Sequence, residues 1–266
     1  MKESVIIRGA GDLATGVAYR LYKSGFDVLM LDIEKPLVIR RTVSYAQAIY
    51  DGEMVIEGVK GVKVESLEAV LSSWKRGEIP VMSDENAESI AELKPRIVVD
   101  AILAKKNLGT TIDMAEIVIG VGPGFTAGVD ADAVVETKRG HYLGSVILEG
   151  SAIPNTGVPG MIGGYDKERV IHSPAEGVIE HIAKIGDVVK AGDVVAKIGD
   201  VDVTVEISGV LRGLIQDGIE VYRGLKIADV DPRGEVDHCF TISDKARAIA
   251  GGVLESIMYK TFREGK

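Results

Sequence analysis

The sequence predicts an α/β fold: a Rossmann-like domain with a parallel sheet, then a β-rich domain, then a C-terminal helix. Three observations predict it. Short β-branched runs alternate with amphipathic helical runs up to about residue 150, which is typical of a parallel sheet with helices on its faces. An internal repeat follows, and then a helical stripe. The predicted boundaries are 1–165, 166–236 and 237–266.

Short runs of buried-strand character mark the predicted parallel sheet. Leu13, Val17 and Leu21 recur at four-residue spacing after the first run, which predicts a helix that packs on the sheet. The segment Ser151–Tyr165 contains two prolines and four glycines, so we expect a structured loop that leads to the second domain. The predicted strands are Val5–Ile7, Asp27–Leu31, Ile79–Met82, Ile97–Val99 and Ile117–Val121.

A glycine-rich turn after the first strand matches the dinucleotide-binding fingerprint, Gly9-x-Gly11-x-x-Ala14. Its glycines let the backbone approach a pyrophosphate, which the following helix N-terminus attracts. Asp32 ends the second strand, where a carboxylate accepts hydrogen bonds from a ribose. Asp12 either caps the helix or repels an anion, and the alternative is a plain strand-to-helix turn. The predicted ligand contacts in the turn are Gly9, Ala10, Gly11, Asp12, Leu13 and Ala14.

A second glycine-rich loop, Gly122–Asp130, follows another predicted strand. Loops beyond the carboxyl ends of parallel strands gather at one crevice, so the two loops predict a narrow cleft for a phosphorylated or planar ligand. Asp130 and Asp132 could orient ligand hydroxyls or amines, or simply be solvated. The predicted contacts from this loop are Gly122, Gly124, Phe125, Thr126 and Asp130.

The predicted second domain repeats itself at a shift of 32 residues, which places Gly177 on Gly209 and Val189 on Val221. Each copy is typical of a β-hairpin-like unit with glycines at its tight turns. The two units resemble the interlocked halves of the barrel-sandwich fold of biotinyl and lipoyl domains. Such carriers need a lysine at the exposed hairpin tip, and Asp200–Glu206 has none. We therefore expect neither biotin nor lipoate, and a role as scaffold, docking surface or cleft wall.

The tail predicts an amphipathic helix. Ser243 is a good N-cap and Asp244 is favourable in the first turn. The apolar stripe that follows must be buried against the first domain or a second subunit, so a homo-oligomer stays open. Its members are Ala246, Ile249, Ala250, Val253, Leu254, Ile257 and Met258.

Charge and composition exclude several classes of partner. Thirty-one basic against forty acidic side chains give a net charge of −9, so we expect no nucleic acid and no anionic membrane surface as partner. The first apolar run is too short for a signal peptide, and the longest weakly charged stretch is broken by proline and glycine. The single cysteine suits a reducing compartment, so we expect a cytoplasmic protein.

Few residues are candidates for chemistry, and whether the chain is an enzyme stays open. Cys239 is the only thiol and therefore the only candidate catalytic residue that could carry sulfur or selenium, although a lone cysteine is usually buried and inert. His141, His172 and His181 are scattered and predict no metal site.

Several long motifs resemble those of the YqeB family, in fixed order and over essentially the whole chain. They include R-G-A-G-D-L-A-T-G (Arg8–Gly16), G-P-G-F-T-A-G-V-D (Gly122–Asp130), R-G-H-Y-L-G (Arg139–Gly144) and N-T-G-V-P-G (Asn155–Gly160). That family is associated with selenium-dependent molybdenum hydroxylases and is related to the XdhC/CoxI maturation factors. The resemblance implies handling of the molybdenum cofactor, a phosphate-bearing pterin, with a molybdenum hydroxylase and a sulfur or selenium donor as partners.

Three hypotheses follow. In the first, the chain is an accessory protein that matures a molybdenum hydroxylase and binds molybdenum cofactor or a nucleotide-like ligand between the two glycine-rich loops. In the second, it is an NAD(P)-dependent oxidoreductase acting on a small molecule, for which no proton donor can be assigned. In the third, it is a non-catalytic scaffold between a hydroxylase and its sulfur or selenium donor. A Gly11→Trp variant separates the first from the third, because only the first predicts that it loses hydroxylase activation.

Overall fold

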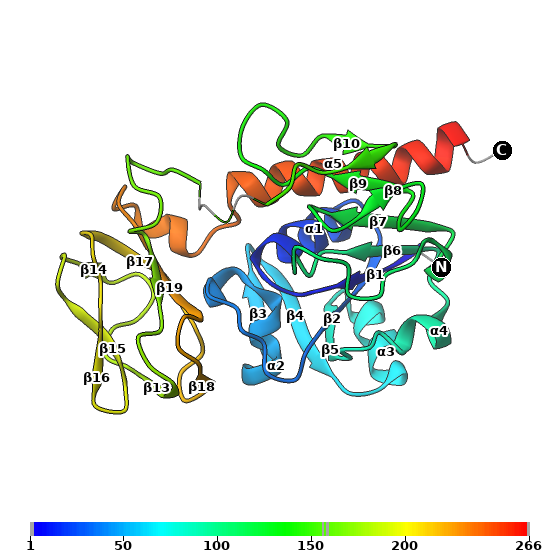
Figure 1. Ribbon diagram of the computed structural model, residues 1–266. Coiled ribbons are helices and arrows are strands. Elements are labelled where there is room, and N and C mark those ends of the chain that lie inside the picture. Colours follow the sequence, from blue (N-terminus) through cyan, green and yellow to red (C-terminus); the bar gives the residue numbers. More distant parts are fainter. Residues whose placement is uncertain (1–2, 156, 158–159, 265–266) are drawn as a thin grey trace. The chain divides into compact units, whose positions relative to one another are not determined.

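The computed structural model describes residues 3–155, 157 and 160–264 and divides into two compact units. Unit 1 consists of Met1–Pro36, Ser44–Asn155 and Ile242–Lys266. Unit 2 consists of Leu37–Val43 and Thr156–Thr241. The chain therefore leaves the first unit for a short excursion before it leaves for the long one, and its last helix returns to unit 1 (Figure 1).

Unit 1 is built on a nine-stranded mixed sheet in the order β10-β9-β7-β6-β1-β2-β5-β4-β3 (Figure 1). The strands from β9 to β4 in this order run parallel, whereas β3 and β10 are antiparallel to their neighbours. All five predicted strands are present. The bounds are β1 Ser4–Arg8, β2 Asp27–Asp32, β3 Glu53–Ile56, β4 Val59–Val64, β5 Ile79–Ser83, β6 Ile97–Asp100, β7 Ile117–Val121, β9 Ala133–Val135 and β10 Val146–Ile147, with β8 Thr126–Ala127 paired to β11 Gly150–Ser151.

The predicted fold class, a Rossmann-like parallel sheet with an inserted barrel-sandwich domain, is wrong. The hairpin β3–β4 and the antiparallel β10 make the sheet mixed. The alternation of strand and helix also stops after β6, because only a short 3-10 turn at Ile112–Met114 lies between β6 and β7. Edge strands added by hairpins need no crossover helix, which is why strand–helix alternation did not reveal them.

Helices cover the sheet of unit 1. In α3, Ser66 accepts a hydrogen bond from the Ala69 amide and Gly77 ends the helix in the left-handed region. In α5 the Ser243 hydroxyl accepts from the Ala246 amide, as predicted, and most of the predicted stripe is buried. Among the described residues no helix is long and apolar enough to cross a membrane. The bounds are α1 Asp12–Lys23, α2 Ala48–Asp51, α3 Leu67–Arg76, α4 Ser89–Leu93 and α5 Asp244–Tyr259, which a π-turn extends over Lys260–Glu264.

Helices α1 and α5 pack closely because the residues at their crossing are small. A Cβ added at Gly16 would lie 2.7 Å from the Ala246 Cβ. Farther along α5, a Cβ at Gly252 would lie 2.2 Å from the carbonyl oxygen of Gly144. The glycines of both helices thus bring α5 against α1 and against the segment that precedes β10.

Unit 2 consists of two four-stranded antiparallel sheets, ordered β12-β19-β17-β14 and β16-β15-β13-β18. The repeat appears as two sets of four strands, β12–β15 and β16–β19, that exchange partners, since β13 pairs with β18, β14 with β17 and β12 with β19. Aliphatic side chains from both sheets form one core. The bounds are β12 Val170–His172, β13 Gly177–His181, β14 Val188–Val189, β15 Val194–Ile198, β16 Val201–Thr204, β17 Gly209–Leu214, β18 Glu220–Val221 and β19 Lys226–Asp231.

The barrel-sandwich prediction for this part of the chain is corrected with the rest of the fold class. Strands β12 and β16 belong to the repeat as well, because the 32-residue shift places Val170–His172 of β12 on Asp202–Thr204 of β16, and each strand forms the edge of one sheet. Each copy thus contributes four strands, and not the smaller hairpin-like unit that the sequence predicted. The predicted boundaries at 165 and 236 both fall inside unit 2.

Candidate functional site

The glycine turn after β1 lies at the carboxyl ends of the parallel strands in unit 1. Gly9 has a φ of +99°, and a Cβ there would lie 2.8 Å from the carbonyl oxygen of Ala101, which follows β6. Only glycine combines this conformation with so close an approach. Gly11 is the N-cap of α1 and has no side chain with which to cap the helix. The first turn of α1 consequently carries the partial positive charge of backbone amides.

Asp32 joins this turn to the end of β2. Its Oδ2 accepts a hydrogen bond of 2.8 Å from the Ala10 amide, and its Oδ1 accepts one of 2.8 Å from the Ile33 amide. Burial raises the pKa of Asp32, although these two amide bonds act in the opposite direction. The carboxylate therefore fixes the shape of the glycine turn. Each oxygen keeps a further lone pair with which it could accept from a ligand hydroxyl.

Lys245 is a half-buried cation beside the turn that the sequence pattern did not single out. It lies in the first turn of α5 and makes no hydrogen bond or ion pair with a described residue. Burial and the Arg139 guanidinium lower the pKa of Lys245, while the carboxylates of Asp12, Glu136 and Asp244 act to raise it. The charge of Lys245 is thus within electrostatic reach of Asp12, the first residue of α1.

A buried network of hydrogen bonds and one ion pair lies at the ends of β1 and β6, next to the glycine turn. Arg8 Nη1 lies 3.3 Å from Asp100 Oδ2, to which the Thr110 hydroxyl donates at 2.6 Å. Arg8 Nη1 also donates to the Thr110 hydroxyl, and Arg8 Nη2 donates to the Leu108 carbonyl at 3.0 Å. These bonds hold the segment that follows β6 against the end of β1. Both residues had a signal in the sequence, because Arg8 directly precedes Gly9 and Asp100 directly follows the predicted strand Ile97–Val99.

The segment after β6 is strained and basic. Leu103 and Lys105 both have a positive φ, of 63° and 64°, which non-glycine residues adopt at a cost of roughly 1–3 kcal/mol each. Lys105 and its neighbour Lys106 are exposed. The contacts of Arg8 and Asp100 hold this segment in its strained conformation.

The second glycine-rich loop packs closely against other parts of the protein. A Cβ at Gly122 would lie 2.9 Å from the Thr137 hydroxyl, and one at Gly124 would lie 2.8 Å from the Lys106 backbone. Phe125 is buried in a small cluster of its own. Asp130 accepts from the Thr126 amide at 2.8 Å and from the Asn107 side chain at 3.4 Å.

Packing therefore explains this loop, and β6 separates its strand from β1 in the sheet. Asp132, which had been considered with Asp130, accepts from the Val118 amide at 2.8 Å and lies 3.6 Å from Lys260 Nζ. The structure thus brings Asp32 to the first turn, and gives the carboxylates of the second loop partners within the protein.

Cys239 lies in unit 2, fully buried, with its Sγ 3.8 Å from the Leu211 carbonyl oxygen. Burial raises the pKa of this thiol, so the thiolate is scarce at neutral pH. The ring of His141 packs edge-on against Tyr142, and His181 Nε2 lies 2.8 Å from the Ile215 carbonyl oxygen. In the described part of the chain, no group of three or more His, Cys, Asp or Glu side chains is placed to hold a metal ion.

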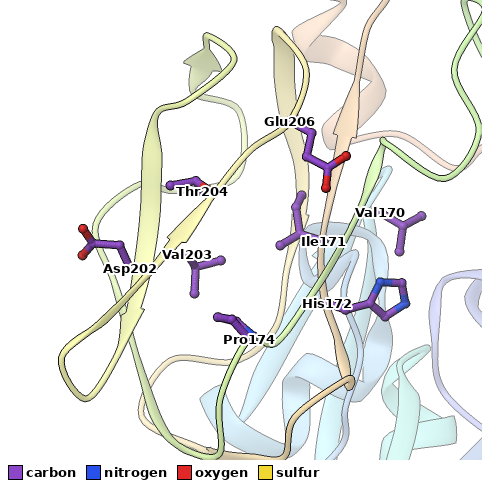
Figure 2. Close-up of a pocket in the computed structure, with 8 residues that line it drawn as sticks. All are labelled: Val170, Ile171, His172, Pro174, Asp202, Val203, Thr204 and Glu206. Carbon is purple, nitrogen blue, oxygen red and sulfur yellow. The ribbon is translucent and has the colours of Figure 1, made fainter.

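Two hollows lie elsewhere, one in each unit. In unit 2 a cavity of about 270 Å³ opens between β12 and β16 (Figure 2). In unit 1 a hollow of about 180 Å³ lies between α1 and α5. Three cations line the second hollow, and one of them, Arg247, binds Glu57 through two hydrogen bonds. The lining residues in unit 1 are Gly16, Tyr19, Arg20, Lys23, Ser24, Ile242 and Arg247.

Several of the solved structures that the chain matches are named as succinylglutamate desuccinylase or aspartoacylase family proteins. An aspartoacylase family protein from Mesorhizobium loti aligns with a TM-score of 0.27 and 12% identity over 86% of this chain and 85% of that one. The ectoine utilization protein EutE from Ruegeria pomeroyi aligns with a TM-score of 0.26 and 11% identity over 76% and 57%. The predicted maturation function and the keywords attached to it are corrected, since none of the matching proteins is named as a molybdenum hydroxylase maturation factor. Similarity at these TM-scores transfers no activity to this chain.

The comparison of sequences is more direct. No family model matches the chain. It is 55% identical over 254 residues to the uncharacterized protein YqeB of Escherichia coli strain K12, an alignment that covers 96% of this chain and 47% of that protein. The chain thus spans about half the length of this curated relative. This alignment gives no support for the predicted relation to XdhC or CoxI proteins. The predicted resemblance to the YqeB family is supported: along the aligned residues, the chain is a homologue of YqeB.

Proposed function

We propose that unit 1 binds a small phosphate-bearing ligand at the first turn of α1, with Lys245 as the principal cation. The observation that carries the proposal is the position of Lys245. It is half-buried, makes no ion pair with a described residue and lies within electrostatic reach of the start of a helix whose N-cap is glycine. An ammonium group and a helix N-terminus attract the same ligand charge.

The Asp12 carboxylate adds a negative charge at the proposed anion site, so its effect must be weighed against that of Lys245. This carboxylate lies in the first turn of α1 and interacts favourably with Lys245. Arg139 forms an ion pair with Asp244, and the Glu136 carboxylate accepts hydrogen bonds from three backbone amides. The amide dipoles of the turn add to the charge of Lys245, and the exposed Lys105 and Lys106 follow the strand next to β1. The balance at this edge supports an anion despite the acidic chain as a whole.

Asp32 supports a ligand that carries hydroxyl groups as well as phosphate. Both of its oxygens hold the glycine turn and each has a spare lone pair. A sugar phosphate or a nucleotide has both groups. The proposed ligand class therefore includes NAD(P), and pyrophosphate, ADP and NAD⁺ are suitable probes.

The experiment is a calorimetric titration of the full chain with these three probes. Charge-assisted hydrogen bonds contribute about 1.5–3 kcal/mol, so Lys245→Gln should weaken binding roughly 10- to 100-fold. The double variant Arg20→Gln/Lys23→Gln is the matched control, because it removes two cations from the hollow between α1 and α5 and leaves Lys245 in place. It should bind like the unmodified chain.

The pH dependence provides an independent readout. The pKa of Lys245 is lowered, so the ammonium is lost at a lower pH than for an ordinary lysine, and affinity should fall as the pH rises through that value. Lys245→Arg should bind and keep its affinity at higher pH, because arginine stays protonated. Binding that survives in Lys245→Gln, or that the control variant abolishes, would refute the proposed position.

We also propose that the chain works in the cytoplasm. Its single cysteine is buried and forms no disulfide. Phosphorylated small molecules of the proposed class are most abundant inside cells. Fractionation of cells that express the full-length protein tests the location, and recovery outside the cytoplasm would contradict it.

A further inference from the structure

Among the described residues of unit 2, two sheet edges have no further strand paired to them, and both edges line the same cavity. Strand β12 ends the order of one sheet and β16 ends the order of the other. The opposite edges, β14 and β18, have two residues each, whereas β16 has four and β12 has three. Short edges are a common protection against pairing with other chains, and β16 lacks that protection.

The cavity between these edges has an aliphatic floor. It measures about 270 Å³, just below the range of about 300–1,000 Å³ of typical small-molecule sites. Ile171 of β12 and Val203 of β16 belong to the core of the unit and lie between the two strands in Figure 2. The run Val201–Val205 alternates β-branched apolar and polar residues, so its backbone favours further strand pairing.

The polar rim of the cavity is acidic. The Glu206 carboxylate lies on the side of β12 in Figure 2 and forms no ion pair with a described residue. Asp202 points away from β12, and its Oδ1 lies 3.7 Å from Lys197 Nζ. His172 is exposed on the opposite strand. Glu206 is thus a carboxylate available to a basic group that enters between the edges.

We propose that this cavity is a docking site for an extended segment of a partner protein, which adds a short strand at β16 and places a lysine or arginine against Glu206. Backbone hydrogen bonds to an open edge give such complexes their affinity, and alternate side chains give them their specificity. The segment fits when a β-branched side chain lies over Ile171 and Val203 and the basic residue is its neighbour in sequence, because successive side chains of a strand point to opposite faces. This site is in unit 2 and does not depend on the function proposed for unit 1.

The probe is the peptide acetyl-Val-Lys-Val-Thr-Val-amide, titrated into the isotope-labelled full chain and followed by amide chemical shifts. The expected result is saturable shifts in β12 and β16. The same peptide with glutamate for lysine should bind several-fold more weakly, and a version N-methylated at alternate amides should bind at least about 10-fold more weakly, since each backbone hydrogen bond contributes about 0.5–1.5 kcal/mol.

Two variants of the protein test the charge. Glu206→Gln should weaken binding of the lysine peptide about two- to fivefold, the range of an exposed ion pair. Glu180→Gln removes another exposed carboxylate, on the interior strand β13, and should have no effect. Equal affinity of the glutamate peptide, equal effects of the two variants, or binding of N-acetyl-lysine methylamide as tight as that of the peptide would overturn the proposal. Shifts confined to other elements, or none at millimolar peptide, would do the same.

Discussion

Two adjacent glycines in α5 should respond to the same substitution with opposite signs. Gly251 is partly exposed and nothing lies within 4 Å of a Cβ added there, whereas a Cβ at the buried Gly252 would lie 2.2 Å from the Gly144 carbonyl oxygen and 2.8 Å from Val135 Cγ1. Replacing glycine with alanine in a helix interior stabilises by about 1 kcal/mol when space allows. Gly251→Ala should therefore raise the free energy of unfolding of unit 1 by about 1 kcal/mol.

Gly252→Ala gains the same helical propensity but must displace a backbone oxygen, which yields less easily than a side chain. Overpacking typically costs about 1–3 kcal/mol, and a backbone contact places this site at the upper end. The net expectation is a loss of about 2 kcal/mol. At roughly 2–4 °C per kcal/mol for a chain of this size, the melting temperature should fall by about 4–8 °C, against a rise of about 2–4 °C for Gly251→Ala.

The fluorescence of Trp74 can report the difference in stability between the two variants, because Trp74 lies in unit 1 together with both glycines. It is the only tryptophan of the chain, it belongs to unit 1, and its Nε1 donates to the Val28 carbonyl at 2.9 Å. Urea unfolding followed by this fluorescence gives the free energy of each variant. Equal stabilities for the two variants, or a Gly252→Ala protein as stable as the unmodified chain, would refute the inferred close packing of α5.

Three further outcomes follow from buried groups. Asp100→Asn breaks the buried pair with Arg8 and should lower the stability of unit 1 by about 3–5 kcal/mol, measured by the same urea titration. In unit 2, burial alone would raise the pKa of Asp231, but hydrogen bonds from Arg233 outweigh it and lower the pKa to about 2. Its stabilisation is therefore present above the ordinary value of 3.8 and lost as the pH falls towards 2, so Asp231→Asn should reduce the acid sensitivity of melts followed by circular dichroism. Cys239 should resist a thiol reagent in the folded protein and react fully in denaturant; rapid labelling without denaturant would contradict its burial.

Most of the central strands could be predicted from sequence, because their β-branched runs are short, continuous and buried on both faces. The hairpin β3–β4 was missed although a signal for it exists. Glu57 and Gly58 separate two alternating runs and both have positive φ, the geometry of a two-residue hairpin turn. Glutamate rarely occupies that position, so the turn does not match the usual Asn-Gly or Asp-Gly pattern. The fold class failed at this edge for that reason.

The candidate site was harder to predict because its decisive residue depends on tertiary packing. The dipeptide Ser243-Asp244 indicated the start of a helix, but nothing local indicates what Lys245 lies against. Its proximity to Asp12 follows from the crossing of α1 and α5 at Gly16 and Ala246, residues near opposite ends of the chain. Asp32 could be found, since its place at the end of the second strand is itself a sequence signal.

Glycine patterns alone could not rank the two loops, because both are rich in glycines with positive φ. A Cβ added at Gly9 or at Gly124 would lie 2.8 Å from a neighbouring backbone atom, so close packing of the protein on itself accounts for both glycines without any ligand. The loops differ in their charged groups. At the second loop Asp130 is bound by the Thr126 amide and the Asn107 side chain, whereas at the first turn Lys245 has no hydrogen-bond partner among the described residues. A partly buried charge without a hydrogen-bond partner is energetically costly unless a bound ligand pairs with it. This favours the first glycine turn over the second glycine-rich loop as the place where the chain binds an anion.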